Sequence, residues 1–146
     1  KNLTYTRDNI GNITAIADNL NPNNTKSYTY DSLNRLTIAT GQWGAITYAY
    51  DPVGNRTYET TDTGNTTYNY TASTNKLASA TGEKNLNFSY DNSGNTVSEN
   101  SRQFVYSQNQ RLTQVTDTGT VLGEYIYNGK GQRVKKCTDN GTHLSL

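Results

Sequence analysis

A pair of aromatic residues separated by a single residue recurs along the whole chain of 146 residues. Side chains at positions i and i+2 of a β-strand point to the same face, so each pair predicts a strand with one aromatic face. Successive pairs begin 20, 20, 20, 16 and 21 residues apart. The pairs are Tyr28 and Tyr30, Tyr48 and Tyr50, Tyr68 and Tyr70, Phe88 and Tyr90, Phe104 and Tyr106, and Tyr125 and Tyr127. Tyr5 begins a partial earlier copy, so the chain is predicted to be a repeat array.

A turn signal follows each pair and takes two alternating forms. One form contains glycine, as in Asp51-Pro52-Val53-Gly54-Asn55-Arg56, and the other ends in a basic residue and leucine, as in Asp31 to Leu36. Asp, Asn and Gly favour turns because they accept local hydrogen bonds or tolerate positive φ. The motif residues of these turns are Asp31, Arg35, Asp51, Gly54, Arg56, Asp91, Gly94, Arg111, Gly131 and Arg133. The alternation predicts a period of about 40 residues, or two hairpins.

The segments between turns predict an all-β fold. Residues 45–50 and 111–116 alternate with a period of two and are rich in β-forming residues. Further turn signals of the Thr-Gly type lie about midway between the aromatic pairs. We expect a long antiparallel meander of short β-hairpins that forms a curved or spiralling sheet, with about a dozen strands of roughly 5–7 residues and essentially no helix. The aromatic ladder should share one face with Leu36, Leu77 and Leu112, while Thr and Asn occupy the other.

Composition narrows the classes of partner. Hydrophobic residues make up 32% of the chain, so the tyrosine rings must supply most of the apolar area that can be buried. A net charge of +1 gives no electrostatic case for nucleic acid, and no apolar run is long enough to insert into a membrane. The single cysteine excludes a disulfide within the chain. The absence of Met and the start in mid-pattern lead us to expect a piece of a longer protein, with open edge strands through which it self-associates.

The motifs Tyr-x-Tyr-Asp-x-x-Gly-Asn-Arg and Tyr-Asp-x-x-Asn-Arg-Leu resemble the YD repeats of the Rhs family. Residues 48–56 and 28–36 match most closely, and the resemblance extends from Tyr5 to about Lys136, so residues 1–146 are expected to form one array. Its repeats start near Tyr5, Tyr28, Tyr48, Tyr68, Phe88, Phe104 and Tyr125. Similar repeats occur in Tc-toxin C components, bacterial wall-associated proteins and animal teneurins. Thr71, Ser107 and Asn128 depart from the pattern because they replace the aspartate.

The resemblance implies a β-shell of a secreted or surface-delivered bacterial protein. In bacterial members such a shell encloses a C-terminal toxic domain, and the toxin chemistry lies in that domain. Toxin members also have an aspartate autoprotease that ends in an Asp-Pro-x-Gly type motif. Asp51-Pro52-Val53-Gly54 has this spelling but lies in mid-array, so we interpret it as a repeat turn and not as a cleavage site.

No set of residues predicts catalysis, a metal or a cofactor. Asp91-Asn92-Ser93-Gly94-Asn95 is similar to the start of a calcium loop, but Arg102 stands where the twelfth, acidic ligand belongs, which favours an Asx-turn. Cys137 and His143 could form a nucleophile–base pair, with Asp139 between them. His143 is the chain's single histidine and lies near its end, which favours chance proximity.

The aromatic and basic residues each allow a binding interpretation beside a structural one. The tyrosine ladder could stack sugars, although packing of the rings across strands is favoured. Trp43, at a turn between Gly41 and Gly44, is the best candidate for a partner contact, although a covered edge is favoured. The basic residues that recur after each turn are expected to pair with motif aspartates or to be solvated.

Three functions are therefore compared. The first is a non-enzymatic wall segment of an Rhs-like shell, whose partners are the rest of the shell and its enclosed C-terminal domain. The second is a cell-surface adhesion module that binds carbohydrate or a partner protein. The third is a hydrolase that uses Cys137 or His143. The sequence favours the first, because the repeats are regular and no catalytic set is present.

Overall fold

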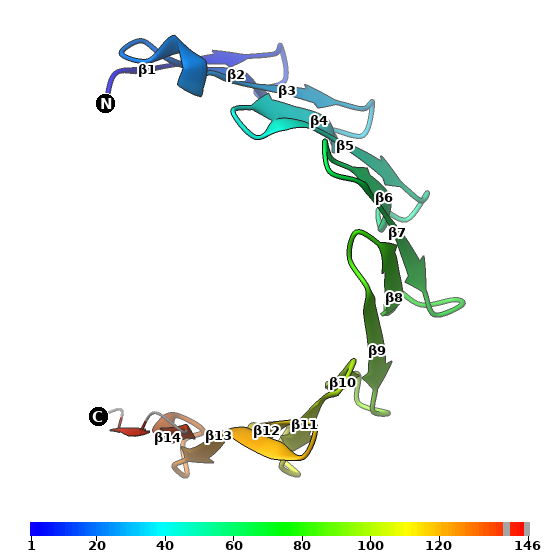
Figure 1. Ribbon diagram of the computed structural model, residues 1–146, viewed down its shortest axis with the longest axis vertical. Coiled ribbons are helices and arrows are strands. Elements are labelled where there is room, and N and C mark those ends of the chain that lie inside the picture. The colour runs from blue at the N-terminus through cyan, green and yellow to red at the C-terminus, as the bar shows by residue number, and fades with distance from the viewer. Residues whose placement is uncertain (139–140, 145–146) are drawn as a thin grey trace. The chain divides into compact units, whose positions relative to one another are not determined.

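The computed structural model describes residues 1–138 and 141–144 and divides the chain into two units, which are described separately. Both units are all-β, and the described residues contain fifteen strands of 4–8 residues and one 3-10 turn (Figure 1). The prediction of an antiparallel meander of short hairpins is confirmed, because each strand pairs antiparallel with its sequence neighbours within its unit. No helix in the described part of the chain is long and apolar enough to cross a membrane.

Unit 1 covers Lys1–Asn85 and contains eight strands in sequence order. Its elements are β1 (Leu3–Arg7), β2 (Ile13–Asp18), η1 (Pro22–Asn24), β3 (Lys26–Tyr30), β4 (Leu36–Gly41), β5 (Gly44–Tyr50), β6 (Arg56–Thr60), β7 (Asn65–Tyr70) and β8 (Leu77–Gly82). The short η1 turn was not predicted. It begins at Pro22 after Asn21, whose side chain accepts a hydrogen bond from the backbone N–H of Asn23.

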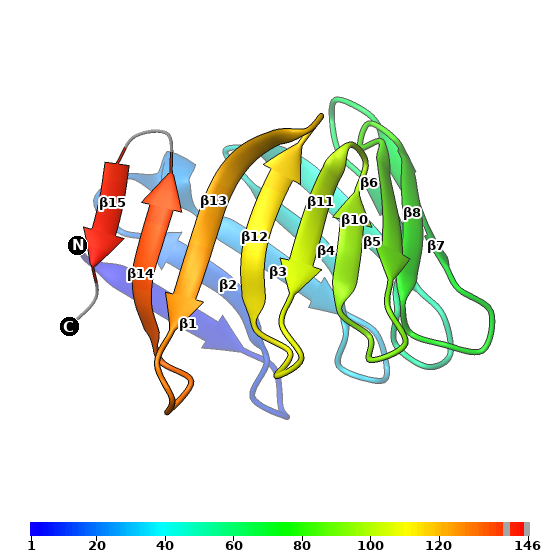
Figure 2. The same cartoon turned by 90° about the horizontal axis from the view of Figure 1, so that it is seen from below.

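Unit 2 begins at Leu86, and its described residues form seven strands, again in sequence order (Figure 2). They are β9 (Leu86–Tyr90), β10 (Thr96–Glu99), β11 (Arg102–Tyr106), β12 (Leu112–Asp117), β13 (Thr120–Tyr127), β14 (Arg133–Thr138) and β15 (Gly141–Leu144). The three hairpin turns that follow its aromatic pairs lie along one edge of the unit, and the turns from β10 to β11 and from β12 to β13 lie along the opposite edge (Figure 2). The turns that follow the aromatic pairs, in both units, and the turn of residues 8–12 that follows the partial copy at Tyr5 are called motif turns below.

The aromatic pairs and the leucines Leu36, Leu77 and Leu112 share one face, as predicted. Tyr30 lies opposite Leu36, and the pairs Tyr70–Leu77 and Tyr106–Leu112 repeat this arrangement. The first aromatic residue of each of these pairs faces a small or β-branched residue that is almost fully buried: Ala39 opposite Tyr28, Ala80 opposite Tyr68 and Val115 opposite Phe104. These cross-strand pairs are the apolar core of each unit.

A β-bulge at the start of the return strand recurs in every motif hairpin. In the hairpin of β3 and β4, Thr29 pairs with Ile38 and Tyr30 pairs with Leu36, so Thr37 is the extra residue. The same shift occurs beside Arg7, Tyr50, Tyr70, Tyr90, Tyr106 and Tyr127. The hydroxyl of Thr37 donates to the carbonyl of Thr29 at 3.1 Å. A bulge bends its strand and increases the local twist, so each of these hairpins is more strongly twisted than a regular two-stranded ribbon.

Candidate functional site

The motif turns are closed by an aspartate that accepts several hydrogen bonds. In residues 51–55, Oδ1 of Asp51 accepts the backbone N–H of Val53 at 3.1 Å and of Asn55 at 2.8 Å, and Oδ2 accepts the side-chain amide of Asn55 at 2.9 Å. The backbone N–H of Gly54 donates to the carbonyl of Asp51 at 3.1 Å, and Gly54 has φ of +96°. Asp51-Pro52-Val53-Gly54 is therefore a hairpin corner, and the prediction that it is not a cleavage site stands untested.

The copies that lack aspartate keep a weaker version of this turn. Asn128 accepts the backbone N–H of Lys130 and of Gln132 at 3.0 Å each, whereas Ser107 accepts that of Arg111 at 3.3 Å. The turn after Tyr70 is one residue longer, and Thr74 takes over as acceptor for the backbone N–H of Lys76 at 3.1 Å. The turn therefore requires a side-chain acceptor and does not require its negative charge.

These hydrogen bonds lower the pKa of the motif aspartates below 3.8, their ordinary value. The backbone N–H of Arg35 is the main cause for the pKa of Asp31, and the side-chain amide of Asn95 is the main cause for the pKa of Asp91. Desolvation in the turn acts to raise the pKa of Asp8 and of Asp51, but the hydrogen bonds within each turn together outweigh it. In all four turns the ionised carboxylate is the form that the fold favours.

We expect the stability of the fold to fall in acid. A carboxyl group with a lower pKa in the folded state stabilises the fold fully above its unfolded pKa, and this contribution is lost as the pH falls through the folded pKa. The free energy of unfolding, measured with urea, should therefore change little from about pH 7 to 5 through these groups and decline below about pH 4. Asp51→Asn and Asp91→Asn, which imitate Asn128, should together flatten the decline. An unchanged acid profile in the double variant would contradict this assignment.

Neighbouring motif turns are connected along their common edge. The side-chain amide of Asn12 donates to Oδ1 of Asn34 in the next turn at 3.1 Å, and Asn55 bonds Asn75 in the same way at 3.1 Å. In unit 2 the amide of Asn95 donates to the side-chain oxygen of Gln110. These bonds always run from a glycine-type turn to the following leucine-type turn, so they give the alternation in the sequence a structural role.

The second tyrosine of a pair connects adjacent strands through its hydroxyl group. Tyr30, Tyr50 and Tyr70 donate to the backbone carbonyls of Ile13, Leu36 and Arg56 at 2.9, 2.7 and 2.9 Å. Each acceptor is the first residue of the preceding strand. The tyrosine therefore buries its ring against the sheet while its polar end satisfies a backbone group.

The basic motif residues lie over tyrosine rings, which the sequence analysis did not anticipate. Guanidinium carbons lie 4.6–5.9 Å from the ring centroids. The contacts are Arg35 with Tyr50, Arg56 with Tyr48 and Tyr68, Arg111 with Tyr127, and Arg133 with Tyr125. Pairing with a motif aspartate occurs at Arg35, whose Nε lies 2.7 Å from Oδ2 of Asp31. Cation–π contact is thus a recurrent use of these cations in both units.

Unit 1 contains a charge cluster centred on the buried Glu59. The Glu59 side chain is 9% exposed, and its two oxygens lie 3.0 Å from Nη1 of Arg56 and 2.6 Å from Nζ of Lys84. The hydroxyl of Tyr68 accepts from Arg56 at 3.2 Å and from Lys84 at 3.1 Å, and donates to Glu59 at 3.4 Å. The hydrogen bond to Glu59, followed by that to Tyr68, raises the pKa of Lys84.

A sequence signal for this cluster was available. Glu59 lies opposite Tyr48 at the position that Ala39, Ala80 and Val115 hold in leucine-type hairpins. A carboxylate there lies on the aromatic face of the sheet, and it requires cations nearby wherever it is buried. Comparison of equivalent positions between copies could have identified it.

The other predicted candidates are not brought together into a reactive site. The Trp43 side chain lies against Gly41, with Nζ of Lys26 5.4 Å from its ring centroid, and the residue is 46% exposed. Cys137 lies half-buried in β14. Asp139 and the side chain of His143 lie outside the described residues, so the nucleophile–base hypothesis is untested. Within residues 1–138 and 141–144, no group of three His, Cys, Asp or Glu residues is placed to hold a metal ion.

The meander of hairpins and the hydrogen bonds between neighbouring motif turns define a class of protein, namely a YD-repeat segment of a β-shell. The Teneurin YD-shell family model matches residues 2–146. The chain therefore belongs to the Teneurin YD-shell family, which confirms the resemblance to YD-repeat proteins seen in the sequence. No curated protein matches the chain closely enough to serve as a relative.

Solved structures show the same fold at low sequence identity. The Tc holotoxin pore of Photorhabdus luminescens superimposes with a TM-score of 0.67 at 16% identity, over 97% of this chain and 9% of that chain. Structures described as TcdB2-TccC3-TEV and TcdB2-TccC3-Cdc42 give TM-scores of 0.68 and 0.67, each at 16% identity. These matches cover 97% and 98% of this chain, and 9% of each of those chains. The chain thus spans about a tenth of the length of these structural neighbours.

Proposed function

We propose that the chain is a non-enzymatic wall segment of a β-shell in a larger, secreted or surface-exposed bacterial protein, and that this shell encloses a C-terminal toxin or effector domain. The proposal is supported by membership of the Teneurin YD-shell family over residues 2–146 and by the fold shared with Tc-toxin structures. Its partners are the rest of the shell and the enclosed domain. The role requires no cofactor.

The observation that carries the proposal is the use of motif side chains to connect one hairpin to the next. Tyrosine hydroxyls bond the preceding strand, asparagine amides bond the following motif turn, and Nη1 of Arg35 donates to the carbonyl of Asp51 in the next motif turn at 2.8 Å. These tyrosines and asparagines, and Arg35, are thus engaged within the sheet. A wall of this kind acts mechanically, since it separates an enclosed domain from solvent until the shell opens.

We expect the wall to protect the region that follows it from proteolysis. The longer protein that contains the chain should be digested with a nonspecific protease, and the half-life of its C-terminal region measured by mass spectrometry. Gly82→Ala and Glu59→Ala, which weaken the sheet for reasons given in the Discussion, should shorten that half-life, whereas Gly129→Ala, which meets no atom within 4 Å, should not. Equal half-lives in all four proteins would contradict enclosure.

Cell-surface adhesion is the second candidate, and the exposed Trp43 favours it. Trp43 lies beside a hollow lined by Leu3, Ile16, Asp18 and Lys26, where an aromatic side chain and polar groups meet as in many binding sites. Binding of a saccharide or a cell-surface protein that is lost in Trp43→Ala, in a protein whose C-terminal region is not protected from protease, would favour adhesion over enclosure.

A further inference from the structure

The turn of residues 107–111 in unit 2 differs from the turn of residues 31–35 in unit 1 in how it uses its arginine. In unit 1, Arg35 is neutralised by Asp31 in its own turn and donates to the carbonyl of Asp51 in the following turn. Arg111 holds the same position in the turn of residues 107–111, but Ser107 replaces the aspartate and accepts the backbone N–H of Arg111 alone. No described carboxylate forms an ion pair with Arg111.

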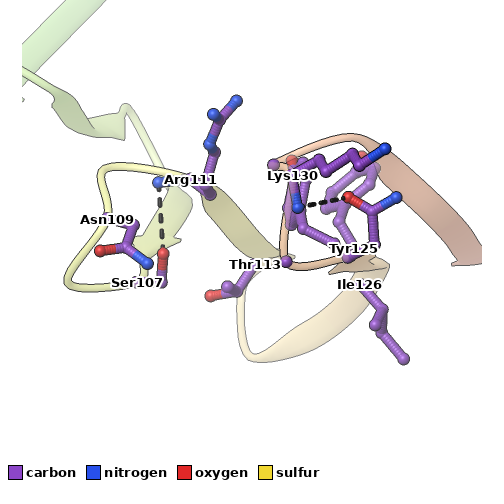
Figure 3. A pocket seen from close by; sticks show the side chains of 11 residues that line it. Ser107, Asn109, Arg111, Thr113, Tyr125, Ile126 and Lys130 are labelled. Atoms are coloured by element: carbon purple, nitrogen blue, oxygen red, sulfur yellow. Dashed lines mark hydrogen bonds between the residues drawn. The ribbon is translucent and has the colours of Figure 1, made fainter.

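The guanidinium of Arg111 lies against the following motif turn, next to Gly131. It lies so close to Gly131 that a Cβ on this residue would be 2.3 Å from Nη2. At the equivalent Gly54 of unit 1, a Cβ would meet no atom within 4 Å. Figure 3 shows the side chain of Arg111 extending away from Ser107. The guanidinium is therefore placed beside the turn of residues 128–131 and not folded into its own turn.

The two turns form a groove of about 540 Å³ with a cationic lining. Lys130 lies on the facing turn, and Asn109 and Thr113 add polar side chains (Figure 3). Asn128 also lines the groove. Asn128 stands where unit 1 has Asp51, so this turn has also lost its carboxylate. The described carboxylates of unit 2 are bonded elsewhere: Asp91 to Asn95, Glu99 to Arg102, Asp117 to Ser101 and Glu124 to Gln114. The groove thus contains two cations without a described anion.

We propose that this groove binds a carboxylate-bearing peptide segment, through the planar guanidinium of Arg111 and the ammonium group of Lys130. The free fork of an arginine matches the two oxygens of a carboxylate, and a lysine contributes a point charge. An acidic peptide suits the groove better than an acidic sugar, because guanidinium groups lie over the rings that a sugar would stack on. These groups are Arg111 over Tyr127 and Arg133 over Tyr125.

Binding is tested on the chain itself with a blocked hexaglutamate peptide, a hexaglutamine peptide as neutral control and sialyllactose as an acidic sugar. Calorimetric titration in about 50 mM salt should detect the glutamate peptide alone, and its affinity should fall as salt is added. In Arg111→Gln/Lys130→Gln the affinity should fall about tenfold or more. Absence of glutamate-peptide binding, or binding of sialyllactose in its place, would overturn the proposal.

Ser107→Asp separates the binding role from a structural one. The new carboxylate should engage Arg111 as Asp31 engages Arg35, so the affinity for the glutamate peptide should fall about tenfold while the midpoint of thermal unfolding stays the same or rises. Loss of binding through damage to the fold would lower that midpoint instead. Unchanged affinity in Ser107→Asp would show that the peptide binds elsewhere and would overturn the proposal.

Discussion

Gly82→Ala is expected to destabilise unit 1 by about 3 kcal/mol or more. Gly82 has φ of +118°, and an alanine Cβ at this residue would lie 2.1 Å from the carbonyl oxygen of Asn65. That oxygen accepts the backbone N–H of Glu83 at 2.8 Å, and Asn65 also pairs with Thr60 on the neighbouring strand. The backbone of Asn65 is thus held from two sides, and relief of the clash requires separation of β7 from β8.

Two other glycines divide this effect into its parts. Gly54 has φ of +96° but open space around it, so Gly54→Ala should show the conformational cost alone, about 1–2 kcal/mol. Gly129 has neither a positive φ nor an atom within 4 Å, so its alanine variant should stay within about 0.5 kcal/mol of the parent. Urea unfolding followed by circular dichroism measures all three. A loss in Gly82→Ala no larger than that in Gly54→Ala would mean that the two strands separate without cost.

The strands, their aromatic faces and the turns between them could be predicted from the sequence, because they depend on the alternation of side chains along a strand and on the residues that favour turns. Tyr48 and Tyr50 define a strand and one of its faces, and Asp51 and Gly54 define the turn that follows. Leu36 was assigned correctly to the face of Tyr30, although a bulge at Thr37 intervenes. The alternation of the two turn forms, which is visible in the sequence, corresponds to hydrogen bonds that run from each glycine-type turn to the following leucine-type turn.

The cross-strand partners could not be predicted, because they depend on register. Each bulge inserts one residue into the return strand, and a period-two pattern contains no sign of it. Without that register, Arg56 could not be placed between Tyr48 and Tyr68, nor Lys84 beside Glu59. Lys84 is 25 residues from Glu59 in the sequence. The two meet because the intervening hairpin of β7 and β8 returns the chain to the edge of the sheet near Glu59.

Glu59→Ala is the second substitution with a large expected effect. Removal of one member of a buried charge group leaves the others uncompensated and costs roughly 3–5 kcal/mol. Arg56 and Lys84 are 39% and 45% exposed, so water compensates part of the loss and we expect about 3 kcal/mol. Tyr68, which is 7% exposed, would also lose the acceptor of its hydroxyl proton.

Unit 2 supplies a matched control for this prediction. Glu99 lies opposite Phe88 as Glu59 lies opposite Tyr48, and it pairs with Arg102 at 3.5 Å. The Glu99 side chain is 30% exposed, so Glu99→Ala should cost about 0–1 kcal/mol. Glu59→Gln keeps the shape and removes the charge, so a loss close to that of Glu59→Ala would assign the effect to the charge. Glu59 differs from Glu99 in its deeper burial and in its additional partners Lys84 and Tyr68. Equal losses for Glu59→Ala and Glu99→Ala in urea unfolding would show that these differences give Glu59 no special role.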